Sequence, residues 1–224
     1  MSAQLTPNLR GKFIVFDGNE GCGKSTQATL AHDRMQKELG LDVLLVRDPG
    51  TTRIGEQIRQ ILLNPENTDM AMRCEMLLYM AARAQMMQEI IQPALDAGKT
   101  VLSDRFISST LAYQLGGDGL TAQEIRAVGE VAISDRWPDL TIIFDLPIEL
   151  SSQRVRPKFT KSANQTDAGE KDRIELRSRE YHEQVRQNYL RQAQDYPQQY
   201  KVIDASRSPE QVHEDVWRAM MQLG

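Results

Sequence analysis

The stretch that most constrains how this chain can fold runs from Gly18 to Thr26 and reads Gly-Asn-Glu-Gly-Cys-Gly-Lys-Ser-Thr. It directly follows a four-residue apolar run, Phe13 to Phe16, and it opens a segment that has the pattern of a helix. Glycine, four residues and then Gly-Lys-Ser, between a strand and a helix, is the pattern of a phosphate-binding loop. The alternative is a glycine-rich turn that happens to contain these letters, and the flanking segments favour the loop.

The residue types in this loop suit the binding of a nucleoside triphosphate. Glycines let the backbone approach an anion closely, so successive N–H groups and the positive end of the helix face the phosphates. Lys24 can reach the outer phosphates, and the Ser25 hydroxyl can ligate Mg²⁺. We therefore expect the triphosphate to contact Gly18, Asn19, Glu20, Gly21, Cys22, Gly23, Lys24, Ser25 and Thr26.

Length and charge narrow the class of protein. A chain of 224 residues suits one domain with its own core, and we expect a single domain over residues 1–224. The net charge of −4 gives no global field that favours nucleic acid or an anionic membrane, so neither is an expected partner. The apolar runs are too short to span a bilayer, and the first ten residues lack a signal-peptide core. Two cysteines form no disulfide framework, which favours a cytoplasmic location.

Short apolar runs alternate with helical patterns along the chain. The run Val43-Leu44-Leu45-Val46 is entirely apolar, which predicts a strand buried on both faces of a parallel sheet. Alternation of this kind predicts a doubly wound α/β fold: a five-stranded parallel sheet with helices on both faces. The expected strands are 12–17, 43–46, 100–103, 140–144 and 200–203.

Helix boundaries follow from capping residues and helix breakers. Gly40 should end the first helix at Leu39, and the next should run to about Leu63. A long helical pattern from Met70 should end near Pro93, and a short helix is expected over 108–114. Capping signals at 121–124 and 208–211 predict two further helix starts. Pro147 suits the first position of a helix, and a polar helix should end near Asp195.

Charged residues follow the ends of the predicted strands. In a parallel sheet, ligands bind outside the carboxyl ends of the strands. Any one such residue could be a helix cap or a surface ion pair, but several at one edge beside a phosphate loop predict a site. Arg47 and Arg105 could hold an acceptor phosphate, because a guanidinium fork matches phosphate oxygens. The full set is Glu20, Arg47, Asp48, Asp104, Arg105 and Asp145.

Residues 151–173 form a polar, basic segment beside these strands. Its central part, 157–171, has almost no apolar content and predicts a mobile loop. Such a flap predicts a lid that closes on the donor nucleotide and excludes water, and the alternative is a merely solvated loop. Its basic residues are Arg154, Arg156, Lys158, Lys161, Lys171 and Arg173.

Six motifs in order resemble those of bacterial thymidylate kinases, and the resemblance extends over nearly the whole chain. The phosphate loop alone is common to many families, but the ordered set is specific. The motifs are Phe16-Asp17-Gly18 with the rest of the loop to Thr26, Arg47-Asp48-Pro49-Gly50, Leu78-Tyr79-Met80-Ala81-Ala82-Arg83, Asp104-Arg105-Phe106, Ser109-Thr110-Leu111-Ala112-Tyr113-Gln114 and Asp172-Arg173-Ile174-Glu175.

The resemblance implies a P-loop nucleoside monophosphate kinase fold that transfers a phosphoryl group from ATP to dTMP. The products would be ADP and dTDP, on the route to dTTP, with Mg²⁺ as cofactor and a homodimer as the assembly. Six of the ten methionines lie between Met70 and Met87, which fits core packing or a helix packed on a second subunit. The three histidines show no ligand spacing, so we expect no structural metal.

The same resemblance implies roles for residues around the phosphates. Lys24, Glu20 and Arg105 would be catalytic, with Glu20 near the sugar 3′-hydroxyl and the phosphates. Arg47 and Arg105 would hold the phosphate of dTMP. Ser25 and Asp104 would serve the metal.

A second set would bind the nucleoside of dTMP. Tyr79 would stack on thymine where relatives usually have Phe, and Arg83, at i+4 on the same helix face, would donate to a thymine carbonyl. Tyr113 would crowd the ribose 2′ position and favour deoxyribose. The base edge would be completed by Ser109, Thr110 and Gln114.

Some relatives carry the arginine that stabilises the transition state in the phosphate loop, and others carry it in the lid. Asn19 and Cys22 are uncharged here, so Arg154 and Arg156 in the lid are the candidate catalytic arginines. The chain departs from the family in having Thr51 where the turn after Arg47 usually has a second glycine. Its lid also looks longer than in many relatives.

Two alternatives to dTMP phosphorylation remain open at this point. One is a kinase for another nucleoside monophosphate, a deoxynucleoside monophosphate or a deoxynucleoside. The other is a nucleotide-binding switch, which would not need a second small-molecule pocket.

Overall fold

A five-stranded parallel sheet forms the centre of the protein, which we describe from a computed structural model covering residues 9–154 and 172–223. The strand order is β2-β3-β1-β4-β5, and every neighbouring pair is parallel, as the sequence predicts. The strands are β1 (Phe13–Gly18), β2 (Val43–Arg47), β3 (Thr100–Asp104), β4 (Leu140–Asp145) and β5 (Tyr200–Asp204).

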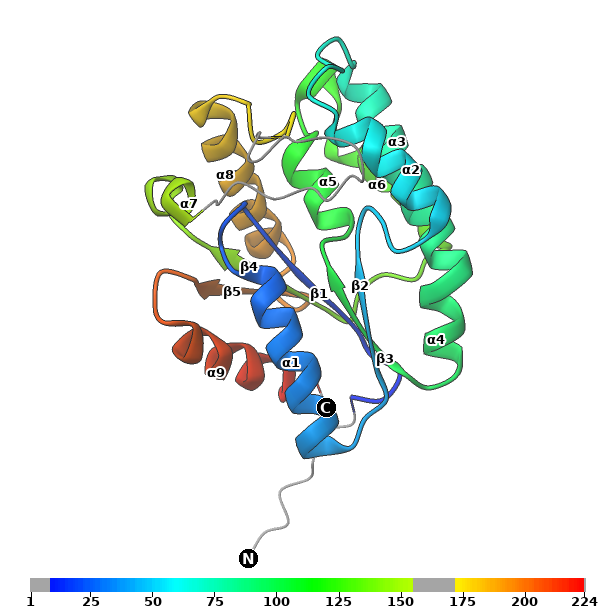
Figure 1. The fold of residues 1–224 in the computed structure, drawn as a ribbon, viewed down its shortest axis with the longest axis vertical. Helices are drawn as coiled ribbons and strands as arrows, with labels where there is room; N and C mark the ends of the chain where they lie inside the picture. Colours follow the sequence, from blue (N-terminus) through cyan, green and yellow to red (C-terminus); the bar gives the residue numbers. More distant parts are fainter. Residues whose placement is uncertain (1–8, 155–171, 224) are drawn as a thin grey trace, which may run out of the picture.

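Helices cover both faces of this sheet (Figure 1). Side chains alternate between the faces of a strand, so Ile14 and Phe16 of β1 pack with α1 (Lys24–Leu39) and α9 (Pro209–Met220). Phe13 and Val15 point the other way into a second core. The helices of that second core are α3 (Met72–Met86), α4 (Gln92–Asp96), α5 (Ile107–Tyr113) and α6 (Ala122–Ile133).

Three further helices complete the fold, and the last of them packs against β4 and β5 in a third core. They are α2 (Arg53–Leu63), α7 (Ile148–Arg154) and α8 (Arg179–Asp195), with a short 3₁₀ turn, η2 (Gly117–Gly119), between α5 and α6. The predicted capping boxes are confirmed at Thr121 and Ser208, and Gly40 ends α1 in the left-handed conformation. Helix α7 begins one residue after Pro147.

Two expectations about this fold are wrong. Strand β2 is not buried on both faces, because it is an edge strand whose Leu45 side chain is 36% exposed. The long helical pattern also does not end near Pro93. A π-helical turn, η1 (Met87–Ile91), leads into α4 without a break in the right-handed helical conformation, and Pro93 lies in the first turn of α4.

Residues 1–8 lie outside the described residues. The central part of the predicted lid, 155–171, also lies outside them, and Arg156 falls in it. In the described ranges no helix is long and apolar enough to cross a membrane.

Candidate active site

The phosphate loop leaves β1 at Gly18 and enters α1 at Lys24, as the sequence predicts. A Cβ atom on Gly18 would lie 2.6 Å from the Phe144 carbonyl oxygen of the neighbouring strand, so only glycine fits there. Gly23 has a φ of 92°, a conformation that favours glycine, and it directs the chain into the first turn of α1. The Lys24 side chain is buried and its Nζ lies 3.2 Å from the Asn19 carbonyl oxygen, which it donates to.

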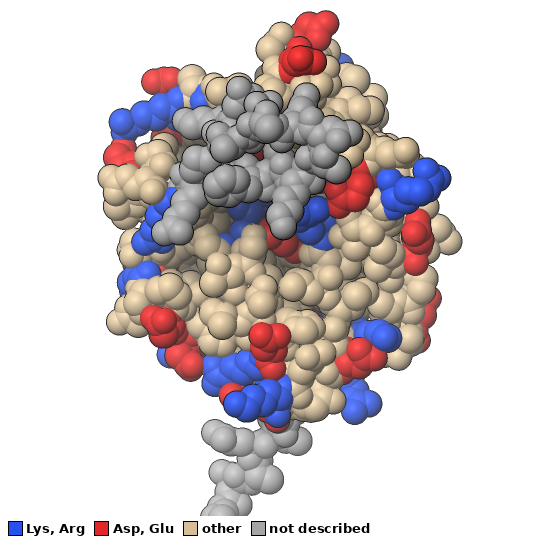
Figure 2. Space-filling model, viewed as in Figure 1, with Lys and Arg blue, Asp and Glu red and all other residues tan. Residues whose placement is uncertain are grey.

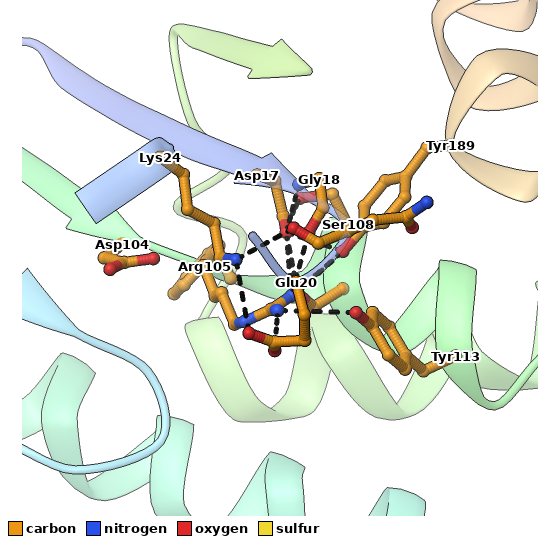
Figure 3. Close-up of polar contacts among 12 residues, drawn as sticks. Asp17, Gly18, Glu20, Lys24, Asp104, Arg105, Ser108, Tyr113 and Tyr189 are labelled. Carbon is orange, nitrogen blue, oxygen red and sulfur yellow. Dashed lines mark hydrogen bonds and ion pairs between the residues drawn. The ribbon is translucent and has the colours of Figure 1, made fainter. Parts of the chain in front are cut away.

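Asp17, the residue before this loop, is a fully buried carboxylate that organises the edge of the sheet (Figure 3). It accepts hydrogen bonds from the hydroxyls of Ser108 at 2.6 Å and Ser109 at 2.7 Å, both on α5. It also accepts one from the Tyr189 hydroxyl of α8 at 2.6 Å. One carboxylate therefore ties the loop to two helices.

Arg105 follows β3 and lies at the centre of the same network (Figure 3). Its Nη2 donates to the Glu20 carboxylate of the phosphate loop and to the Tyr113 hydroxyl at 3.3 Å, while Nη1 donates to Ser109 Oγ at 2.9 Å. Burial by itself lowers the pKa of Arg105, but the surrounding phenol and carboxylate oxygens outweigh it and raise the pKa well above its ordinary value. A permanent positive charge is thus held beside the loop.

Ser25 of α1 contacts Asp104 at the end of β3. The Ser25 hydroxyl donates to Oδ2 of Asp104, and Oδ1 of Asp104 is buried without a hydrogen-bond partner in the part of the chain described. Hard oxygen ligands of this kind fit Mg²⁺, which proteins commonly hold with one or two carboxylates plus substrate phosphates. The described residues contain no cluster of three or more His, Cys, Asp or Glu that could hold a metal ion.

A cavity of about 220 Å³ opens beside the loop and continues it toward α3 and α5. In Figure 2, basic and acidic side chains lie side by side in a hollow of the surface. The lining brings together every residue predicted to bind dTMP: Arg47, Tyr79, Arg83, Arg105, Ser109, Thr110, Tyr113 and Gln114. It also includes Glu20, Lys24, Ser25 and Asp104, so the two predicted halves of the site share one cavity.

Arg83 is buried and reaches this cavity through a fixed set of contacts. Its Nε donates to Oδ2 of Asp48 at 2.6 Å, and its Nη1 donates to the Thr110 hydroxyl at 3.2 Å. Burial raises the pKa of Asp48, and the adjacent Arg83 opposes that rise. Oδ1 of Asp48 is buried with no partner in the described ranges, so an acceptor lies at the wall of the cavity.

Arg47 is held at the mouth of the cavity by the turn that follows β2. Its Nη2 donates to Oε1 of Glu56 on α2 at 2.8 Å. Thr51 adopts a φ of 68°, in the left-handed region that favours glycine. The Thr51 hydroxyl accepts from the Arg47 backbone N–H and donates to the Arg47 carbonyl, both at 3.0 Å, and so closes the turn.

Arg154, one of the two candidate lid arginines, ends α7. Its Nη1 donates to the Ala205 carbonyl oxygen at 2.8 Å, and its Nη2 donates to that of Ser206 at 3.2 Å. In the described structure its guanidinium therefore contacts the segment after β5, at the edge of the sheet where the phosphate loop also lies. The position of Arg156 lies outside the described residues.

Sequence reasoning missed several residues of the site. The sequence assigned Asp17 no role beyond its place in a motif. Tyr189, which donates a hydrogen bond to Asp17, lies 172 positions further along the chain. Arg59 of α2 lines the cavity and donates to the Pro49 carbonyl at 3.1 Å, and burial lowers its pKa. Arg59 could have been found from the sequence, because it is a basic residue on the second predicted helix. No local pattern indicates that Tyr189 belongs to the site.

The arrangement defines a class of protein. A phosphate loop, a hydroxyl and carboxylate suited to Mg²⁺, and an arginine-lined cavity next to them can position two phosphates for direct transfer. A nucleotide switch would need only the loop. Fold and site therefore define a P-loop kinase that acts on a small phosphorylated acceptor.

Comparison with known proteins identifies the family. The sequence model of a family described as "Thymidylate kinase" matches residues 16–216. A thymidylate kinase of Nitratidesulfovibrio vulgaris is 42% identical over 214 residues, covering 94% of this chain and 96% of that protein. One of Halothermothrix orenii is 42% identical over 209 residues, covering 93% and 96%. The chain belongs to the thymidylate kinase family.

A solved structure agrees with this assignment. The crystal structure of thymidylate kinase from Ehrlichia chaffeensis is similar with a TM-score of 0.72 at 28% sequence identity. The similarity covers 93% of this chain and 98% of that chain. The nucleoside monophosphate kinase fold expected from the sequence is therefore confirmed.

Proposed function

We propose how this thymidylate kinase divides its reaction, the transfer of a phosphoryl group from ATP to dTMP, among its residues. The products are ADP and dTDP, which supply dTTP synthesis. Every relative named above is a thymidylate kinase, so nothing favours another nucleotide acceptor or a nucleotide switch. The observation that carries the assignment of roles is that all eight residues expected to bind dTMP line one cavity continuous with the phosphate loop.

The donor half binds ATP through residues 18–26. The backbone N–H groups of the loop hold the phosphates, and Lys24 stabilises their outer charge. Ser25 and Asp104 would hold Mg²⁺, which would neutralise charge on the phosphate oxygens. The buried, unpartnered oxygen of Asp104 supports this role.

The acceptor half binds dTMP through residues from four elements. Arg47 and Arg105 hold the phosphate of dTMP, and Tyr79 stacks on the base while Arg83 donates to it. Arg105 already lies beside Glu20 and Tyr113, so a phosphate bound there would be close to the loop. Glu20 would approach the sugar 3′-hydroxyl, and Tyr113 would exclude a 2′-hydroxyl. Ser109, Thr110 and Gln114 complete the base edge.

We further assign residues 151–173 to a lid, with Arg154 and Arg156 as its catalytic arginines. Arg173, expected among the basic residues of the lid, is instead buried and paired with Glu75. The uncharged loop residues Asn19 and Cys22 support this assignment, because the transferring phosphoryl group needs a cation from elsewhere. Arg154 lies near the start of this lid and contacts the segment after β5.

We also propose a cytoplasmic homodimer. Apolar side chains are exposed on neighbouring helices of one face, Leu77 of α3 at 53% and Val131 of α6 at 84%. Helices α3 and α6 pack against each other, so the two side chains can contribute to one interface. Sedimentation of the wild type and of a Val131→Glu variant tests this: a dimer that the variant converts to a monomer is expected.

The acceptor assignment is tested by ADP release with ATP and Mg²⁺ and separate acceptors. These are dTMP, dUMP, dCMP, dGMP, UMP and thymidine, with EDTA as the control for metal dependence. We expect rapid release with dTMP, weaker release with dUMP and none with thymidine, which carries no phosphate for Arg105. Equal release with every acceptor would contradict the pocket assignment, and turnover in EDTA would contradict the metal assignment.

A further inference from the structure

Glu75 of α3 is a fully buried carboxylate that none of the roles above uses. Its Oε1 accepts a hydrogen bond from Nε2 of Gln114 at 2.7 Å. Its Oε2 accepts from Nη2 of Arg177 at 2.6 Å and from Nη2 of Arg173. Because both oxygens are held by donors on different elements, the carboxylate has a single orientation.

Glu75 lies next to the wall of the cavity because of its position on α3. Tyr79 follows it at i+4 and Arg83 at i+8, so the three side chains lie on one face of α3. Tyr79 and Arg83 line the cavity, and so does Gln114, the residue directly after α5. Glu75 therefore lies directly behind a cavity-lining amide.

The contact fixes which end of the Gln114 amide faces the cavity. An ionised carboxylate only accepts hydrogen bonds, so the NH₂ group of Gln114 must be the end that faces Glu75. The amide oxygen is the other end of the group, and among the described residues it accepts no hydrogen bond. The cavity is presented with a hydrogen-bond acceptor and not with a donor.

We propose that Glu75 is a positioning residue that locks Gln114 as an acceptor and so selects a base with a protonated ring nitrogen. Thymine carries a proton on N3 and can donate to this oxygen, whereas N3 of cytosine is itself an acceptor and would face it unpaired. Unpaired polar groups in a closed site are strongly disfavoured, which makes the orientation of one amide a means of selection. The inference rests on the proposed function, since it requires the base to lie against Gln114.

The test uses the ratio of kcat/KM for dTMP to that for dCMP. In Glu75→Gln, residue 75 can donate or accept, so Gln114 can turn over without losing its partner. We expect the ratio to fall about tenfold or more while KM for ATP stays within twofold, since one hydrogen bond of discrimination is removed. A ratio that is unchanged in the folded variant would overturn the proposal.

A swap variant, Glu75→Gln with Gln114→Glu, provides the rescue. It places an acceptor-only group at position 114 and a donor behind it, so the cavity again receives an oxygen. We expect the dTMP preference to return toward the wild-type ratio. The swap keeps a donor and an acceptor paired between positions 75 and 114, so it is assayed even if the single variant does not fold. A folded swap variant that has lost the preference for dTMP over dCMP would overturn the proposal.

Arg177→Met is the matched control, because it removes a partner of the other Glu75 oxygen and leaves the contact with Gln114. We expect a lower melting temperature and an unchanged ratio. A fall in the ratio equal to that of Glu75→Gln would mean general loosening and would overturn the proposal. Gln114→Leu tests the premise: an unchanged KM for dTMP would remove Gln114 from the base site, whereas absent dTMP turnover by the wild type would contradict the function itself.

Discussion

Arg105 and Glu20 form an ion pair that joins the end of β3 to the phosphate loop. The same guanidinium also donates to Ser109, Tyr113 and Tyr189, so its plane is fixed by groups from three elements. The charge that should meet the acceptor phosphate is thus oriented by the protein before any transfer. Orientation in advance is what makes such a charge effective, because no reorganisation is needed in the transition state.

Replacing Arg105 with lysine should therefore impair catalysis although the charge is kept. An ammonium group cannot donate to all of these partners at once or present a planar fork to a phosphate. We expect kcat to fall by about 10²–10³, with a smaller change in KM for ATP. Steady-state kinetics on Arg105→Lys, with the exposed Arg218→Lys as the control, checks this, and a kcat within twofold of the wild type would contradict the role.

The turn at Thr51 predicts an unusual order of stabilities. Thr51→Ala loses both hydroxyl contacts with Arg47 and keeps a Cβ atom at a φ of 68°, whereas Thr51→Gly loses the contacts but relieves the backbone. We expect the alanine variant to be less stable than the glycine variant by about 1 kcal/mol. Urea unfolding of the two variants measures the difference, and an alanine variant at least as stable as the glycine variant would refute the prediction.

The two candidate lid arginines should separate in their effects. Arg154 donates to two backbone carbonyls after β5, so Arg154→Ala should lower the melting temperature as well as kcat. Arg156→Ala, alone or combined with Arg154→Ala, should lower kcat with little change in nucleotide affinity, by about 10³-fold or more if it stabilises the transition state. Single-turnover kinetics distinguishes the two, and unchanged turnover in the double variant would remove both from the mechanism.

The two cysteines should differ in reactivity with pH. Cys74 is exposed, while Cys22 is buried in the phosphate loop, and burial raises the pKa of the Cys22 thiol. The thiolate is the reactive form, so at pH 8 one thiol per native chain should react with a thiol reagent, and Cys74→Ser should abolish that reaction. The Cys22 reaction should appear only at higher pH or on unfolding, and two fast-reacting thiols in the native chain would contradict the assignment.

The sign of the corresponding stability effect follows from the same shift. The native state holds the Cys22 proton to a higher pH than the unfolded chain does. The contribution of this group to stability is therefore complete below the ordinary cysteine pKa and declines as pH rises above it. Replacement by serine should reduce that decline, which thermal melts between pH 7 and pH 10 can measure.

Local patterns predicted the structure of the phosphate loop and of the helix after it. The phosphate loop and α1 depend on glycines, a strand before them and a capping glycine after them, and all of these are neighbours in sequence. The helix Lys24–Leu39 has the bounds that the sequence predicted. Five of the six strand-end residues also line one cavity, because parallel strands bring their carboxyl ends to one edge. Asp145 does not line it and instead accepts two hydrogen bonds from Arg186.

Other features depend on contacts that no local pattern records. Arg83 pairs with Asp48, which lies 35 residues away, and Glu75 accepts a hydrogen bond from Gln114, which lies 39 residues away. The apolar letters of β2 do not reveal that it is an edge strand, because strand order is set by how the helices cross the sheet. The local pattern around Pro93 also does not show that helical structure continues past it to Asp96.

The two strands that lead into the site differ in how many neighbouring strands they pair with, and this affects how such enzymes can diverge. In the described sheet β1 has a neighbour on each side and carries the phosphate loop, whereas β2 pairs only with β3 and carries Arg47 and Asp48. Changes in β2 and the turn after it disturb one strand pairing and leave the central strands intact. Recognition of the acceptor can thus be remodelled in evolution or by design while the machinery that handles ATP is conserved.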